Sequence, residues 1–233
     1  MVRQEGNRLV IEEGLTRVYI ECWGESSLRV RMTAEPEMDK NDWALCERVE
    51  EVTPVITFTE VDVTDPWYKG DEWKKYHQTG TVATLTNGKI TAEVSPEGWI
   101  RFLNQRGEVL TEEYWRNRNR INRYCVPLRV DARELKPVMG SCDYELTARF
   151  EAYDDEKIFG MGQYQEKHLD KKGATLELAQ RNSQASVPFY VSSRGYGFLW
   201  NNPAIGTATF GTNKTEWYAK RTKKLDYFIT AGD

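Results

Sequence analysis

Hydrophobic and polar residues alternate in short segments along most of the chain, and turn residues separate these segments. Between residues 27 and 33, Leu28, Val30 and Met32 alternate with Arg29 and Arg31, which predicts a strand with one buried face. Similar patterns predict strands at 9–11, 16–22, 52–63, 81–86, 89–94, 99–103, 108–110, 145–153, 174–178, 189–191, 196–200, 207–210 and 215–219. No segment longer than about ten residues keeps the 3.6-residue apolar period of a helix.

The turn residues between these strands indicate how the strands are arranged, and therefore the fold class. The dipeptide Asn87-Gly88 separates two of the strands and is the strongest short signal for a β-hairpin. Turn signals recur roughly every 8–12 residues, as in an antiparallel β-sandwich. No strand–helix–strand pattern occurs, so neither a Rossmann fold nor a TIM barrel fits this chain. We therefore predict an all-β protein with an antiparallel β-sandwich.

Several polar stretches interrupt the strands. The ranges 34–51 and 111–140 are predicted to be a loop and a long connection, and Lys220–Lys224 an exposed basic turn. The aromatic-rich stretch 64–80 is predicted to be a flap folded on its own body or a contact in a homo-oligomer, because isolated monomers rarely expose such residues. The connection contains a run of alternating arginines and asparagines: Arg116, Asn117, Arg118, Asn119, Arg120, Asn122 and Arg123.

The amino-acid composition limits which binding partners and which cellular compartment we expect for the protein. A formal net charge of −4, from 32 basic and 36 acidic residues, gives no electrostatic basis for binding nucleic acid or an anionic membrane. No apolar run approaches the ~20 residues that span a bilayer, and the N-terminal residues show no signal peptide. The four cysteines show no CxxC spacing, which predicts a reduced cytoplasmic protein with buried thiols: Cys22, Cys46, Cys125 and Cys142. Two disulfides would form only in an exported protein.

The stretch 159–202 contains the candidate chemistry. A polar loop follows the strand at 174–178, and an aromatic strand follows the loop. Amide groups donate and accept hydrogen bonds and a guanidinium donates in a fork, so such a loop can bind a polar substrate. The candidate substrate-binding residues of this loop are Gln180, Arg181, Asn182 and Gln184, with Ser183 between them. An alternative remains open, in which these amides only hold the loop backbone.

This stretch resembles the N-terminal domain of the family-31 glycoside hydrolases, which include α-glucosidases and α-xylosidases. The resemblance rests on Gly160, Gly162 and Gln163, on the run from Pro188 to Phe198, and on Asn201. A final segment, Leu225 to Ile229, is similar to the strand that precedes the catalytic barrel in the family. The resemblance implies one galactose-mutarotase-like sandwich (supersandwich) domain over residues 1–233, with a catalytic TIM barrel expected after residue 233.

The resemblance also implies a function. The parent protein is expected to be a retaining α-glycosidase that hydrolyses terminal α-linked glucosyl or xylosyl residues. The loop at 180–184 is expected to contact the aglycone side of the substrate, and the domain to pack on the barrel. Some family members carry an acidic residue at the position of Asn182. The sequence leaves glucoside and xyloside specificity open.

The chain itself is expected to lack the catalytic groups. A retaining glycosidase needs two carboxyl groups about 5–5.5 Å apart. The adjacent pairs Glu112-Glu113 and Asp154-Asp155 occur in polar, turn-like surroundings that do not favour this arrangement. We expect no cofactor and no metal, because His77 and His168 lack companions at metal-ligand spacing. The segment from Gly160 to Gly162 lacks the residues of a phosphate loop and is predicted to form a tight turn.

Two other functions remain as alternatives. The first is a stand-alone carbohydrate-binding module without hydrolase activity. The second is a mutarotase-like epimerase, which requires a catalytic histidine and glutamate that face one pocket. The two histidines of the chain are the available candidates for that histidine.

Overall fold

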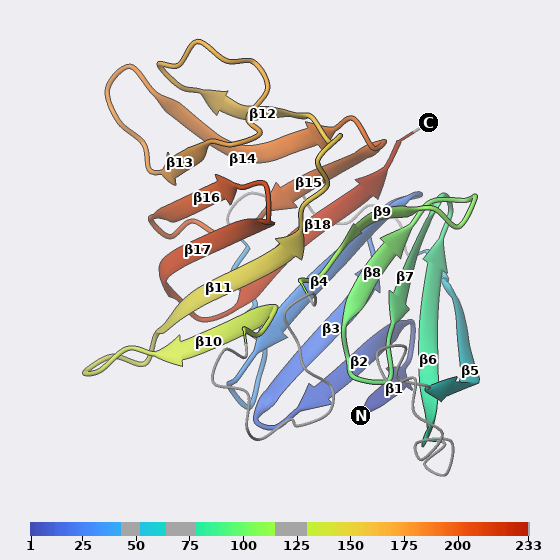
Figure 1. Ribbon diagram of the computed structural model, residues 1–233. Coiled ribbons are helices and arrows are strands. Elements are labelled where there is room, and N and C mark those ends of the chain that lie inside the picture. Colours follow the sequence, from blue (N-terminus) through green and yellow to red (C-terminus); the bar gives the residue numbers. More distant parts are fainter. Residues whose placement is uncertain (43–51, 64–77, 115–129, 233) are drawn as a thin grey trace, which may run out of the picture.

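The computed structural model describes residues 1–42, 52–63, 78–114 and 130–232 of the chain, and these residues form three antiparallel sheets (Figure 1). No helix occurs within these four ranges, as the lack of a helical period predicts. Likewise, no helix in the described ranges has the length and apolarity that a membrane crossing requires. The prediction of an all-β antiparallel sandwich is confirmed.

The largest sheet has eight strands and combines both ends of the described chain. Its strand order is β1-β2-β3-β4-β18-β15-β14-β12. The strands are β1 (Val2–Glu5), β2 (Arg8–Glu13), β3 (Thr16–Cys22), β4 (Ser27–Thr33), β12 (Ile158–Gln163), β14 (Ala185–Ser192), β15 (Tyr196–Trp200) and β18 (Leu225–Ala231). Strand β18 lies between β4 and β15 and therefore joins the N-terminal strands to the later ones (Figure 1).

Two five-stranded sheets complete the fold. One has the order β10-β11-β17-β16-β13 and consists of β10 (Arg133–Pro137), β11 (Tyr144–Glu151), β13 (Thr175–Leu178), β16 (Gly206–Phe210) and β17 (Lys214–Thr222). The other is a meander of β5 (Val55–Val63), β6 (Gln78–Asn87), β7 (Ile90–Val94), β8 (Ile100–Leu103) and β9 (Val109–Glu112).

A single cluster of buried side chains connects the three sheets. Between the eight-stranded sheet and the β10–β17 sheet, aromatic rings are stacked. The ring centroid of Trp217 lies 5.3 Å from those of both Phe198 and Trp200. Towards the β5–β9 sheet, Phe102 meets Tyr227 edge to face at 6.3 Å. Burial of such large aromatic side chains supplies much of the stability of a core.

The predicted hairpin at Asn87-Gly88 also joins two sheets. Asn87 is buried at the end of β6, and its side-chain amide donates to the carbonyl oxygens of Gly24 (2.9 Å) and Ser27 (2.8 Å). Gly88 has a φ of +55°, and a Cβ atom there would overlap the carbonyl oxygen of Glu25. The hairpin therefore docks on the turn between β3 and β4, and only glycine fits its tip.

Several local predictions are wrong. Strand β1 was not predicted, and β10 lies inside the range 111–140, which we expected to be a connection. The range Lys220–Lys224 is not an exposed turn, because β17 continues to Thr222 and Lys224 is buried. The Lys224 ammonium donates to the carbonyl oxygens of Asp39 (2.9 Å) and Asn41 (2.5 Å), while burial lowers its pKa.

Other expectations concern residues that are only partly described. Residues 34–42 form a loop, as predicted, whereas residues 43–51 lie outside the described ranges. Most of the aromatic stretch 64–80 and all of the arginine–asparagine run also lie outside them, as do His77, Cys46 and Cys125. Cys22 is buried as expected, but Cys142 is exposed, which corrects the prediction that the thiols are buried.

Candidate functional site

The polar loop lies where the chain crosses from one sheet to another. Strand β13 ends at Leu178 in the β10–β17 sheet, and β14 begins at Ala185 in the eight-stranded sheet. Between them, the backbone N–H of Gln184 donates to the carbonyl oxygen of Arg181 at 3.1 Å, which closes a tight turn. Ser183 has a φ of +69° at this turn, in the left-handed region that few non-glycine residues adopt. The loop therefore has a defined conformation at one end of the sandwich.

Gln180 is used to hold the loop. Its amide nitrogen donates to the carbonyl oxygen of Ser186 at 2.7 Å, and its amide oxygen accepts from the Ser186 N–H at 3.1 Å. The Tyr164 hydroxyl adds bonds of 2.9 Å to the Ser186 hydroxyl and to the Glu177 carbonyl oxygen. These contacts hold the two ends of the loop together. For Gln180, the amide therefore binds the loop backbone, as in the alternative stated above.

Arg181 is also engaged within the protein. Its Nη2 atom lies 2.5 Å from a carboxylate oxygen of Glu177, four residues earlier on β13. The two side chains are 58% and 45% exposed, so solvent screens the ion pair and it contributes little to stability. This pair orients the guanidinium while leaving several of its N–H groups on the surface.

Asn182 and Gln184 differ from these two residues. Asn182 is exposed and Gln184 is half-buried at the tip of the loop. Within the described ranges, neither side-chain amide makes a hydrogen bond to the protein. The structure thus divides the four predicted site residues into two that hold the loop and two whose amides are available to a ligand.

The glycines before this loop allow two backbones to approach closely. Gly160 and Gly162 do not form the predicted tight turn but flank a bulge inside β12, where the register with β14 shifts. A Cβ atom on Gly160 would lie 2.6 Å from the Phe189 carbonyl oxygen, and one on Gly162 would overlap that of Ala185. Met161, with a φ of +72°, has a fully buried side chain. The bulge fixes β12 against the start of β14 and so supports the loop.

The two carboxylate pairs have different surroundings from those expected. Glu112 and Glu113 lie at the end of β9 and not in a turn. Glu113 is buried, accepts a 3.0 Å hydrogen bond from the Ile100 N–H and pairs with Arg133 at 3.2 Å. Glu112 accepts a 2.8 Å hydrogen bond from the Tyr153 hydroxyl. Both groups are thus engaged in structural contacts.

The remaining candidates lie on the surface. The Asp154-Asp155 pair occupies an exposed turn, as predicted, and the Asp155 side chain is 84% exposed. His168 lies on an exposed loop, where its ring makes no hydrogen bond within the described ranges. These ranges contain no group of three or more potential metal ligands.

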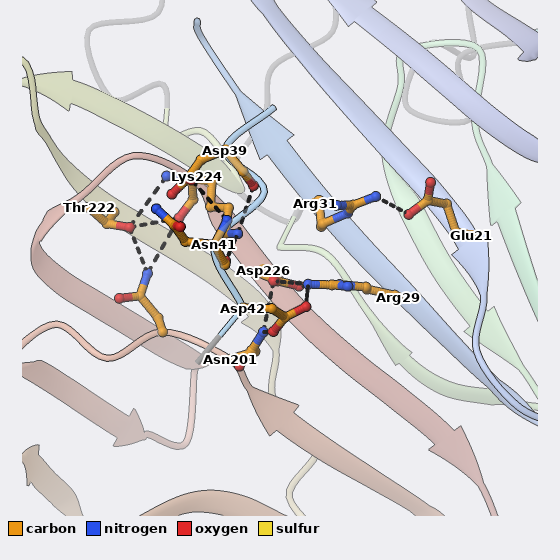
Figure 2. Close-up of polar contacts among 11 residues, drawn as sticks. Glu21, Arg29, Arg31, Asp39, Asn41, Asp42, Asn201, Thr222, Lys224 and Asp226 are labelled. Atoms are coloured by element: carbon orange, nitrogen blue, oxygen red, sulfur yellow. Dashed lines mark hydrogen bonds and ion pairs between the residues drawn. The ribbon is translucent and has the colours of Figure 1, made fainter. Parts of the chain in front are cut away.

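A buried polar cluster, which the sequence analysis did not predict, lies across β4, β18 and the end of β15 (Figure 2). The Asp226 carboxylate is fully buried and accepts from Arg29 Nε at 2.9 Å, from Arg29 Nη2 at 2.6 Å and from the Asn201 amide at 2.8 Å. Asp42 joins the cluster through Arg29 Nη2 at 2.9 Å. Asn201 and the segment that contains Asp226 contribute to the family resemblance, but nothing in the sequence indicated that they pair with Arg29. Through Asp42, the cluster anchors the loop that follows β4.

The three antiparallel sheets without a helix in the described ranges are consistent with a galactose-mutarotase-like β-sandwich domain. Residues 17–207 match the family model of the glycosyl hydrolase 31 N-terminal galactose mutarotase-like domain. The chain therefore belongs to glycoside hydrolase family 31, and the resemblance stated above is confirmed.

Individual relatives agree with this assignment. An uncharacterized family 31 glucosidase, ORF2, of Pseudescherichia vulneris is 45% identical over 223 residues, which are 92% of this chain and 38% of the relative. The crystal structure of a family 31 α-xylosidase from a soil metagenome, complexed with xylose, is 44% identical in sequence and has a TM-score of 0.83. The match covers all of this chain and 32% of the α-xylosidase. A xylosidase from Aspergillus niger, at 24% identity and a TM-score of 0.71, shares the fold. The chain thus spans about a third of the length of these relatives, from 30% to 38%.

Proposed function

We propose that the chain is the N-terminal domain of a retaining α-glycosidase that hydrolyses terminal α-linked glucosyl or xylosyl residues. The observation that carries this proposal is the similarity to a family 31 glucosidase and a family 31 α-xylosidase across nearly the whole chain. The two adjacent carboxylate pairs do not suit glycosidic cleavage, because Glu112 and Glu113 make structural contacts and Asp154 and Asp155 lie on an exposed turn. In this proposal, the catalytic carboxylates come from a barrel in the same polypeptide.

The loop between β13 and β14 would contact the aglycone side of the substrate. The proposal gives the four candidate residues two roles. Gln180 and Arg181 fix the loop through Ser186 and Glu177, and the Arg181 guanidinium retains exposed donors. Asn182 and Gln184 present amides that can both donate to and accept from sugar hydroxyls. The Asn182 amide can bind a hydroxyl without adding charge.

The first experiment measures the hydrolysis of aryl α-xylosides and α-glucosides by the longer polypeptide that contains this chain. We expect cleavage, and NMR should show that the first product keeps the α-configuration. Residues 1–233 alone should show no cleavage. Inversion of configuration, or cleavage by residues 1–233 alone, would contradict the proposal.

The second experiment tests the loop with Asn182→Ala in the longer polypeptide. Loss of a hydrogen bond to a bound hydroxyl costs about 0.5–1.5 kcal/mol, or several-fold in kcat/KM. We expect this loss for disaccharides, whose aglycone is a sugar, and not for aryl glycosides. Asn213→Ala is the matched control, since Asn213 is exposed on the turn between β16 and β17. Equal kinetics of Asn182→Ala and the parent on all substrates would rule out the contact.

A cytoplasmic location is proposed on chemical grounds. Cys142 has a free and exposed thiol, which is compatible with a reducing compartment. Fractionation of cells that express the gene, followed by immunoblotting, tests this location. Recovery of the protein outside the cytoplasmic fraction would overturn it.

A further inference from the structure

One strand of the eight-stranded sheet exposes apolar side chains on the face that points away from the core. In β14, Tyr190 and Ser192 point inward and are buried. The alternating residues Val187, Phe189 and Val191 point outward and are 50%, 39% and 49% exposed. We call these three residues the β14 patch. Their identity is unusual, because a sheet face in contact with water normally carries polar residues.

Neighbouring strands extend the patch across the same face. Phe189 is paired in register with the half-buried Leu199 of β15, which is paired in turn with Phe228 of β18. Val191 is paired with Gly197, which adds no side chain. The β14 patch therefore continues into Leu199. Phe228 is itself buried, and its register partner on β4 is Arg29, so the charged part of the face begins there.

On the other half of the same face, strands β2 to β4 carry charged side chains. On β2 to β4, Glu21 pairs with Arg8 at 3.3 Å and with Arg31 at 2.5 Å. The Arg8 guanidinium lies 4.4 Å from the centroid of the Tyr19 ring. Charged pairs and cation–π contacts cover these strands, so the apolar surface is confined to β14 and Leu199 beside it.

We propose that the β14 patch is the surface on which the catalytic part of the same polypeptide docks. This inference rests on the proposed function, which supplies that catalytic part. The chain covers only 38% and 32% of the lengths of the two relatives cited, and the matching family model describes an N-terminal domain. The patch also begins beside the loop, because Val187 lies three residues, or roughly 10 Å along the strand, from Gln184. One body can thus contact both the loop and the patch.

The size of the patch favours a covalently linked partner over a second copy of the chain. A standard interface between separate proteins buries about 800 Å² on each partner, far more than three half-exposed side chains offer. A partner in the same polypeptide needs less area, because the linkage keeps it at a high effective concentration. Interfaces within a chain are accordingly smaller than those of obligate dimers.

The test is hydroxyl-radical footprinting of two phenylalanines, in residues 1–233 and in the longer polypeptide. Phe189 is 39% exposed and Phe58, on the edge strand β5 of a different sheet, is 43% exposed, so Phe58 is a matched control. We expect oxidation of Phe189 to fall several-fold in the longer polypeptide, while oxidation of Phe58 changes little. Equal oxidation of Phe189 in both proteins overturns the docking surface.

The outcomes separate the docking surface from the proposed function. Equal oxidation of Phe189 in a polypeptide that cleaves α-glycosides refutes only the docking surface. Protection of Phe189 in a polypeptide that cleaves none refutes only the proposed function. Protection in residues 1–233 that rises with protein concentration, or only with added oligosaccharide, would indicate a second copy or a sugar surface instead and would overturn the docking surface.

A pair of variants provides a second measurement. Val191→Glu places a charge in the β14 patch, whereas Val55→Glu places one at a position that is 64% exposed on β5. Both variants should leave the thermal unfolding of residues 1–233 within a few degrees of the parent. In the longer polypeptide, only Val191→Glu should increase the rate at which a protease separates the two parts. Equal cleavage rates for the two variants would count against the docking surface.

Discussion

Arg29 and Asp226 form a two-point ion pair although 197 residues separate them in the chain, with Nε–Oδ1 and Nη2–Oδ2 distances of 2.9 and 2.6 Å. Their side chains are 6% and 0% exposed. The rings of Trp23 and Phe228 lie about the guanidinium, with centroids 5.1 and 5.0 Å away. Strands β4 and β18 are thus joined by side chains as well as by their backbone ladder.

The first prediction concerns this pair. Asp226→Ala leaves the Arg29 charge buried with one carboxylate partner fewer, so we expect a loss of about 3–5 kcal/mol in the free energy of unfolding. Urea unfolding monitored by tryptophan fluorescence measures the change. Glu108→Ala is the control, because the side chains of its ion pair with Arg106 are 60% and 79% exposed and solvent screening leaves the pair little effect on stability. Similar losses for the two variants would contradict the prediction.

The second prediction concerns the bulge in β12. Gly140→Ala, at a φ of +75° with open space around it, should cost only the ~1–2 kcal/mol of a left-handed alanine. Gly162→Ala has a similar φ of +89°, but its Cβ would overlap the Ala185 carbonyl oxygen. We expect a clearly larger loss of unfolding free energy for Gly162→Ala, measured by chemical denaturation. Equal losses would mean that the two strands separate at little cost.

The third prediction concerns how Gln180 holds the loop. In Gln180→Ala, the Ser186 N–H loses its acceptor, so its amide hydrogen should exchange faster with solvent. Gln180→Glu keeps an acceptor for this N–H and loses only the donor to the Ser186 carbonyl oxygen. Protection should therefore persist in Gln180→Glu, as measured by NMR-detected hydrogen exchange at neutral pH. Unchanged exchange in Gln180→Ala would show that the contact does not stabilise the loop.

The fourth prediction concerns alkaline pH. Burial, and then the nearby Glu112 carboxylate, raise the pKa of Tyr153 above its ordinary value of 10. The folded protein therefore keeps a proton that the unfolded chain loses, and the stability from this group is present below pH 10 and declines above it. Tyr153→Phe should lower stability near pH 8 by about 1 kcal/mol, through its lost hydrogen bond.

The same variant should also change the pH dependence. Tyr153→Phe removes one titrating group, so the decline of unfolding free energy above about pH 10 should be less steep than in the parent. Burial likewise raises the pKa of Tyr190, Tyr196 and Tyr227, so part of the decline should remain. Denaturant unfolding at a series of pH values provides the measurement. Parallel curves for parent and variant would refute the assignment to Tyr153.

The elements that the sequence predicts are those with a strong local cause. The hairpin at Asn87 follows from the turn chemistry of two residues, and β11 follows from an alternating run whose inward residues are all buried. Strand β10 has a polar pattern because it is an edge strand. Its residues form a strand by pairing with β11, and the local sequence does not reveal that pairing. Glu113 and Lys224 looked like surface residues because their partners, Arg133 and the carbonyl of Asp39, are distant in sequence.

The site shows the same limit. Alternation and glycine placement located the loop at 180–184, but Gln180 and Gln184 are chemically identical in the sequence. Only the structure shows that Gln180 is bonded to Ser186 while the Gln184 amide is available. The Arg29–Asp226 cluster was missed for a similar reason, because an arginine at an alternating position reads as a solvated residue.

The position of β18 has a consequence for how the protein is made. Residues 225–231 pair with β4 on one side and with β15 on the other. During synthesis, β4 therefore has no partner on this side until some 190 further residues have been translated. Until then, β4 and β15 have open backbone edges that can pair with other nascent chains. Truncated products that stop before Leu225 should therefore aggregate during synthesis, and chaperones should be needed mainly in this interval.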